Sequence, residues 1–201
     1  MDSDQIYGGR ITSEEKTAIS TYVGVGVAVL LTAVAVYFFF LTQREKNETK
    51  GFDPNRAIPT DAVLKSRLKG EEYNVVRQAG TQTPFQNEFW NNDRVGLYVD
   101  VITGEPLFSS LDKFDAGLGM PSFTKPISND VVAESVDTSH NMQRTEVHSK
   151  RSNAHLGHLF PEPKSPTGQI YSVNSAAFHF IPIEQMKAQG YEAFLPLLEK
   201  K

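Results

Sequence analysis

The chain has 201 residues, the length of one domain with short extensions. It contains no cysteine, which excludes disulfide bonds, thiolate nucleophiles, and cysteine-ligated zinc or iron–sulfur sites. Its formal net charge of -4 leaves no positive excess to neutralise phosphates, so nucleic acid is not expected as a partner.

The first predicted element is a membrane-spanning helix. Residues 22–41 carry no charged side chain, and at 1.5 Å per residue they form about 30 Å of helix, enough to cross the hydrocarbon core of a bilayer. A cleavable signal peptide would have a shorter apolar stretch that ends in small residues, whereas this one ends in three phenylalanines and Leu41. We therefore expect an N-terminal tail over 1–18, one transmembrane helix within 19–42, and the lipid bilayer as a partner.

Basic residues on either side of this helix predict its orientation. The two on the N-terminal side are Arg10 and Lys16, and the four on the C-terminal side are Arg44, Lys46, Lys50 and Arg56. The positive-inside rule therefore favours a single-pass membrane protein whose large domain lies on the cytoplasmic side, or on the equivalent side of an organelle. The margin is small, and an exported domain stays open as the alternative.

Residues 43–70 are expected to form a linker with a short helix. The stretch 42–59 is charged, contains Gly51 and two prolines, and has no apolar period. Thr60 or Asp61 is a suitable cap for a short helix that runs through Leu68. From about residue 73 the pattern changes to that of short strands.

The body of the chain, 71–182, is predicted to be mainly β. Residues 94–102 alternate, with the four side chains Val95, Leu97, Val99 and Val101 on one face, and 143–148 and 177–182 are similar. Turn-forming residues at 103–106, 115–117 and 161–168 separate the strands. The last segment, 183–201, is predicted to be helical with a break near Gly190.

His155 and His158 are the first pair of side chains that suggest chemistry. In a regular strand a spacing of three places them on opposite faces, and the usual zinc partners are absent, so we predict neither a metal site nor a cofactor. Ser172 lies within a predicted strand and outside any G-x-S-x-G turn, which argues against a hydrolase nucleophile. The stretch 112–117 has too few oxygen ligands for calcium and is interpreted as a charged turn.

Six sequence blocks, in order between Glu71 and Pro182, resemble the methionine-R-sulfoxide reductases (MsrB). The blocks read GTQTPFQ from Gly80, GEPLFSS from Gly104, KFDAGLGMPSF from Lys113, SHNMQRTEV from Ser139, HLGHLF from His155 and PTGQIYSVNSAAFHFIP from Pro166. The resemblance implies an MsrB-like fold of two antiparallel sheets with short peripheral helices. It also implies reduction of the R epimer of methionine sulfoxide in proteins.

The chain departs from this family at several positions of one pocket. The family's nucleophilic cysteine corresponds to Ser172, and a serine cannot replace it, because the analogue of the sulfenic acid intermediate would need an O–O bond. The family tryptophan that packs against the substrate's methyl group corresponds to Met120, the arginine before the nucleophile to Ile170, and the resolving cysteine of some members to Leu118. Several departures in one pocket indicate a natural domain that has lost the reaction.

Other pocket positions of the family are retained. His155, His158 and Asn174 correspond to residues that orient or protonate the sulfoxide oxygen in the family. The alternative, which we favour, is that they hold neighbouring strands together by hydrogen bonds. Zinc-binding members carry two Cys-x-x-Cys pairs, which correspond here to Asp100 with Thr103 and Ser149 with Ser152, so no metal is expected. Because zinc-free members of the family exist, this departure says nothing about activity.

The sequence thus predicts a membrane-anchored, catalytically inactive MsrB-like domain. We expect it to act as an accessory or interaction subunit of a membrane complex, respiratory and photosynthetic complexes being candidates, with membrane-protein subunits as partners. Two alternatives stay open. One is a membrane-anchored peptide-methionine (R)-S-oxide reductase whose catalytic cysteine has been substituted. The other is a non-catalytic binder of oxidised methionine.

Overall fold

A computed structural model describes residues 51–199 without a gap, together with residues 13, 14, 16, 22, 26 and 29–38. Residues 29–38 are α-helical. The expected N-terminal tail, transmembrane helix and linker up to residue 50 lie wholly or in part outside these residues. Within the described residues, no helix has both the length and the apolar character to cross a bilayer. Residues 1–49 and 50–201 form separate compact units, and the second contains all the elements that follow.

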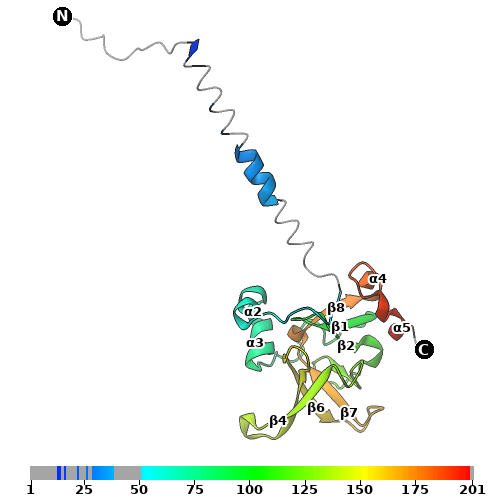
Figure 1. The fold of residues 1–201 in the computed structure, drawn as a ribbon. Helices are drawn as coiled ribbons and strands as arrows, with labels where there is room; N and C mark the ends of the chain where they lie inside the picture. Colours follow the sequence, from blue (N-terminus) through cyan, green and yellow to red (C-terminus); the bar gives the residue numbers. More distant parts are fainter. Residues whose placement is uncertain are drawn as a thin grey trace, which may run out of the picture. The chain divides into compact units, whose positions relative to one another are not determined.

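Two antiparallel sheets form this second unit (Figure 1). The three-stranded sheet has the order β2 (Pro106–Ser109), β1 (Gly96–Asp100), β8 (Phe178–Pro182). The five-stranded sheet has the order β3 (Ser122–Phe123), β7 (Gln169–Val173), β6 (His155–Pro161), β5 (Arg144–Ser149), β4 (Val132–Asp137). The predicted mainly β class is confirmed, and so are the strands expected at 143–148 and 177–182.

The main core lies between the two sheets and is rich in aromatic rings. Phe108 on β2 stacks on Phe123 of β3, with the ring centroids 4.6 Å apart, and Tyr98 on β1 lies 4.9 Å from Phe123. All three side chains are fully buried. Since large aromatic side chains bury the most apolar surface per residue, these contacts join the sheets and stabilise the fold.

β1 is shorter than the strand predicted over 94–102, and both of its faces are buried. Leu97 and Val99 pack against the C-terminal helical segment, whereas Tyr98 faces the main core. Val95 lies outside the strand and is 40% exposed, and Val101 lies in the following turn and contributes to the main core. Of the four side chains predicted on one face, Leu97 and Val99 share it, whereas Val95 and Val101 do not, because the strand covers only Gly96–Asp100.

Two helices precede the sheets, although only one was predicted. α2 (Asp61–Arg67) is the expected short helix, and its Leu64 is fully buried in the main core. α3 (Gly70–Gln78) occupies a stretch that was expected to begin the strands. The backbone N–H of Lys69 donates to the Glu72 carboxylate over 2.8 Å and caps α3, which packs on β6. Strands were predicted from about residue 73 because few residues of this stretch are apolar, and they show no clear helical period.

The C-terminal segment covers the outer face of the three-stranded sheet. It contains α4 (Ile183–Met186), the 3-10 turn η4 (Glu192–Phe194) and α5 (Leu195–Leu198), whose side chains pack with β1. Gly190 adopts a positive φ of 80° between α4 and η4. The prediction of short helices broken near Gly190 is confirmed.

The chain is already packed on the domain at Gly51, in a stretch expected to be linker. Gly51 is buried with a φ of 79°, and an added Cβ would overlap the carbonyl group of Gly190, so only glycine fits here. The Arg151 guanidinium lies 5.6 Å above the Phe52 ring and donates to the carbonyl of Arg56 over 2.7 Å. Residues 51–56 are therefore part of the folded domain.

Candidate functional site on the outer face of the five-stranded sheet

A row of polar side chains crosses all five strands of the larger sheet. In order from β3 to β4, its members are Ser122, Ser172, His158, Glu146 and Ser135. Directly opposed residues of antiparallel strands present their side chains on the same face. The neighbours of Ser172 on β7, Tyr171 and Val173, belong to the main core. The polar row therefore lies on the outer face of the sheet, away from the core.

His155 lies on the same face as His158, contrary to the prediction. Val147 pairs with Gly157, but the next residue of β5 pairs with His155, so Leu156 is the extra residue of a β-bulge. Leu156 points into the core, and the two histidine rings lie 5.6 Å apart between centroids. The predicted opposite faces are wrong because the bulge adds one residue to the two-residue period of the strand.

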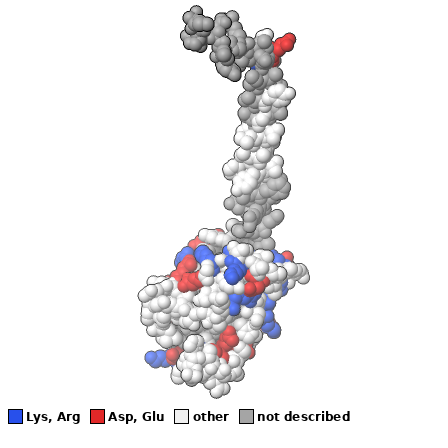
Figure 2. Space-filling model, turned by 90° about the vertical axis from the view of Figure 1, so that its left-hand side faces the viewer, with Lys and Arg blue, Asp and Glu red and all other residues white. Residues whose placement is uncertain are grey.

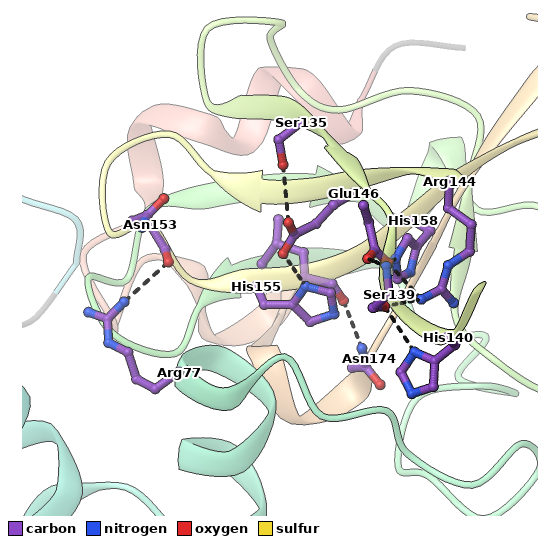
Figure 3. Close-up of polar contacts among 12 residues, drawn as sticks. Arg77, Ser135, Ser139, His140, Arg144, Glu146, Asn153, His155, His158 and Asn174 are labelled. Atoms are coloured by element: carbon purple, nitrogen blue, oxygen red, sulfur yellow. Dashed lines mark hydrogen bonds and ion pairs between the residues drawn. The ribbon is translucent and has the colours of Figure 1, made fainter. Parts of the chain in front are cut away.

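Each histidine is hydrogen-bonded to a carboxylate from another strand. Nδ1 of His155 lies 2.7 Å from Oε1 of Glu146 on β5, and Nε2 of His158 lies 2.7 Å from Oδ2 of Asp137 on β4 (Figure 3). Arg144 also donates to Asp137, over 2.6 Å. These bonds join β4, β5 and β6, which supports the interpretation that the histidines hold neighbouring strands together.

Both carboxylates are kept ionised by their surroundings. The hydroxyl and backbone N–H of Ser139, together with His158, hold the pKa of Asp137 far below its usual range. Burial opposes ionisation of Glu146, but hydrogen bonds from His155 and Ser135 outweigh burial and lower its pKa. Since an ionised carboxylate only accepts hydrogen bonds, Nδ1 of His155 must be the donor to Glu146.

His155 is neutral at pH 7 and has no proton to offer a ligand through its other nitrogen. Burial lowers the pKa of His155 below 6.5, an effect larger than the opposing one of Glu146. With its proton on Nδ1, the ring carries a lone pair on Nε2, a buried atom that bonds to no group of residues 51–199. A sulfoxide oxygen is itself an acceptor, so neutral His155 does not stabilise it.

The lowered pKa values predict how acid destabilises the domain. Well above pH 6.5 His155 is deprotonated in both states and costs no stability. As the pH falls through 6.5, the unfolded chain binds a proton that the folded chain resists, and the free energy of unfolding falls. Glu146 and Asp137 add a further loss below pH 4.5 and 3.8, their ordinary values. Urea unfolding at several pH values, followed through the one tryptophan, Trp90, measures both stages.

A matched pair of variants tests whether His155 causes the loss of stability that begins near pH 6.5. His155→Asn keeps a donor toward Glu146 but does not titrate, so the loss of stability between about pH 7 and 5 should become smaller. His179→Asn changes an exposed histidine of β8 and should leave this loss as it is. An unchanged slope in His155→Asn would contradict the assignment.

The Ser172 hydroxyl is not placed as a nucleophile beside a base. Ser172 is 9% exposed on β7, on one side of His158, whereas Nε2 of His158 points to Asp137 on the other side. Within the part of the chain that the structure describes, no hydrogen bond joins the side chains of Ser172 and His158. A serine, histidine and aspartate thus follow one another across the sheet without forming a proton relay.

The amide of Asn174 is held by two hydrogen bonds inside the protein. Its Nδ2 donates to the carbonyl of Leu156 over 3.0 Å, and its Oδ1 accepts the backbone N–H of Gln82 over 2.9 Å. Asn87 acts in the same way next to it, since it donates to the carbonyl of Gly119 over 2.7 Å. The sequence did not reveal Gln82 and Asn87, because their partners, such as Asn174 and Ser175, lie far along the chain and only the fold brings them near.

The substituted positions gather around Ser172 to different extents. Ile170 is buried on the same face of β7, two residues before Ser172. Met120 precedes β3, the strand that pairs with β7, and its sulfur lies 3.5 Å from Nδ2 of Asn87. Leu118 is 44% exposed in the preceding loop. Ile170 therefore shares a face with Ser172, whereas Leu118 is largely exposed.

The positions that hold thiols in zinc-binding relatives form a buried hydrogen-bonded cluster. Asp100 is fully buried and accepts the hydroxyl of Ser152 over 2.5 Å and the backbone N–H of Ile102 over 2.7 Å. Ser149 accepts the N–H of Ser152 over 3.3 Å, and Thr103 accepts that of Glu105 over 3.2 Å. A carboxylate and hydroxyls therefore link the two turns directly.

Asp100→Ala is expected to lower the free energy of unfolding by about 3 kcal/mol, because it leaves two buried donors, the Ser152 hydroxyl and the Ile102 N–H, without an acceptor. Asp93→Ala removes an exposed carboxylate and should change stability by less than about 0.5 kcal/mol. Urea unfolding of both variants measures the difference. Equal stability of the two variants would show that the cluster does not hold the turns.

The family model of the SelR domain matches residues 68–182, more than half of the chain. The match includes α3, every strand of both sheets and all the residues of the polar row. SelR domains are methionine-R-sulfoxide reductases, so the resemblance of the six sequence blocks is confirmed. The chain belongs to the SelR family, that of the methionine-R-sulfoxide reductases.

Proposed function

We propose that this protein is a membrane-anchored SelR-domain protein that no longer reduces methionine sulfoxide and serves as an accessory subunit of a membrane complex. The observation that carries the loss of activity is Ser172, at the position of the family's nucleophile in a chain without cysteine. The family reaction requires a thiolate that attacks the sulfoxide sulfur and becomes a sulfenic acid. A hydroxyl cannot take the oxygen atom in this way.

The surroundings of Ser172 support the loss of activity. The side-chain oxygen and nitrogen of Asn174 each form a hydrogen bond within the protein. So do Nδ1 of His155 and Nε2 of His158. Neutral His155 offers no donor to a sulfoxide oxygen. Ile170 and Met120 stand where the family has an arginine and a tryptophan, so two substrate contacts of the family are missing as well.

The accessory role is inferred because the domain keeps the family's fold but lacks the residues that carry out its reaction. The carboxylate–histidine pairs still link three strands of the sheet, so the retained polar residues serve the stability of the fold. The uncharged segment 22–41 would keep such a domain at a membrane. We therefore expect a folded but catalytically inactive domain at a bilayer to act by binding partner proteins through its surface.

Purification from membranes in mild detergent tests this role. The expected result is a particle much larger than the chain's 22.4 kDa plus its detergent, with stoichiometric partner subunits and no reductase activity with dithiothreitol. A lone monomer would contradict the accessory role. Stereospecific reduction of the R-sulfoxide by the unaltered chain would contradict the loss of activity.

A further inference from the structure

One end of the domain combines the point where the folded chain begins with exposed apolar and basic side chains. We call it the anchor-proximal surface and define it as residues 51–69. Figure 1 shows α2 at the same end of the domain as α4 and α5, whereas the β4–β5 hairpin lies at the opposite end. Gly51 packs on Gly190 between α4 and η4, so the beginning of the folded chain is held at this end.

A short stretch of sequence separates this surface from the expected membrane span. Residues 42–50 separate the predicted end of the span from Gly51. A fully extended chain covers at most about 3.4 Å per residue, so these residues reach about 30 Å. Because Gly51 is held on the domain, residues 51–69 are the first part of the folded domain after the predicted span.

Two apolar side chains of this surface point to solvent. Ile58 is 42% exposed and Val63 on α2 is 48% exposed, whereas the next residue, Leu64, is fully buried. Leu64 thereby fixes α2 to the core and turns Val63 outward. Exposed aliphatic side chains with basic residues close to them in the chain are typical of surfaces that lie in the headgroup layer of a bilayer.

The charge of this surface is opposite to that of the chain as a whole. Residues 51–69 contain four basic and two acidic side chains, in a chain with 20 basic and 24 acidic ones. Asp61 accepts the Tyr73 hydroxyl over 2.6 Å and lies 3.7 Å from the Arg77 guanidinium. Arg67 donates to the carbonyl of Ile102 over 2.8 Å, and Lys69 lies 3.6 Å from Glu72, whereas Lys65 is exposed and has no such partner among the described residues. Figure 2 shows Lys and Arg side chains gathered, with acidic ones among them, over the upper part of the domain.

We propose that the anchor-proximal surface lies against the bilayer, with Ile58 and Val63 in the headgroup layer and Lys65 beside the phosphates of anionic lipids. The inference rests on the membrane anchor of the proposed function and adds the orientation of the domain. It directs the β4–β5 hairpin away from the bilayer. Each basic side chain near an anionic membrane surface adds to the attraction.

The absence of cysteine makes the test direct, because an introduced cysteine is the one site of labelling. Val63→Cys and Val136→Cys variants of the full chain receive a nitroxide and are reconstituted in nanodiscs of phosphatidylcholine with a minority of phosphatidylglycerol. Val136 is a matched control, a valine that is 69% exposed on β4. The label at residue 63 should be severalfold less accessible to a water-soluble nickel reagent than the label at 136. Ile58→Cys should behave like Val63→Cys.

Equal accessibility at residues 63 and 136 would overturn the inference. Replacing phosphatidylglycerol by phosphatidylcholine should raise the accessibility at residue 63, and an unchanged value would exclude the role of Lys65. Flotation of the same samples with liposomes after a salt wash tests the anchor separately. A chain that floats but shows equal accessibility contradicts the orientation alone, whereas a chain that does not float contradicts the membrane anchor as well.

Discussion

Gly157→Ala is expected to unfold the domain or to lower its free energy of unfolding by about 3 kcal/mol or more. Gly157 lies on β6 opposite Val173 of β7. An added Cβ would overlap the carbonyl oxygen of Ser172 and lie 2.7 Å from the Cα of Val173. These are backbone atoms, so the methyl group is accommodated only if β6 and β7 separate. Their separation would disrupt both the polar row and the core beneath it.

The control for this variant is Gly70→Ala. Gly70 is the first residue of α3, and no atom lies within 4 Å of an added Cβ. Alanine favours a helix by about 1 kcal/mol over glycine, so this variant should be neutral or slightly more stable. Urea unfolding followed by Trp90 fluorescence compares the two. A similar stability of both variants would contradict the close approach of β6 and β7.

Ser172→Cys is expected to show no reduction of methionine R-sulfoxide above that of the unaltered chain. The new thiol would lie beside Ile170 and near Met120, without the arginine and tryptophan of the family. Neutral His155 still offers no proton to the sulfoxide oxygen. A thiolate is necessary for the reaction, but it does not bind or orient the substrate. Turnover of a methionine R-sulfoxide peptide with dithiothreitol measures the result.

The matched comparison is a triple variant in which Met120→Trp and Ile170→Arg accompany Ser172→Cys. Reduction by the triple but not by the single variant would place the loss in the whole pocket. Robust turnover by Ser172→Cys alone would contradict this explanation and favour the alternative of a reductase with one substituted residue. The unfolding midpoint of each variant shows whether it remains folded.

Several features of the site depended on long-range contacts. Asp137 and Glu146 were not identified from the sequence, because a carboxylate on an alternating strand is typical of a solvated face. Only the pairing of β4, β5 and β6 brings them to His158 and His155. α3 was missed for a related reason, since its packing on β6 decides its conformation more than its weak apolar pattern does.

The sequence by itself determined the mainly β class, the family through six ordered blocks, and the absence of any thiol at residue 172 or elsewhere. These are properties of residue type and order, which need no coordinates. Only the tertiary structure decided that His155 and His158 share a face, because a β-bulge depends on the pairing of two strands. It also decided that residues 51–56 belong to the domain, since Gly51 is placed by contact with Gly190 far along the chain.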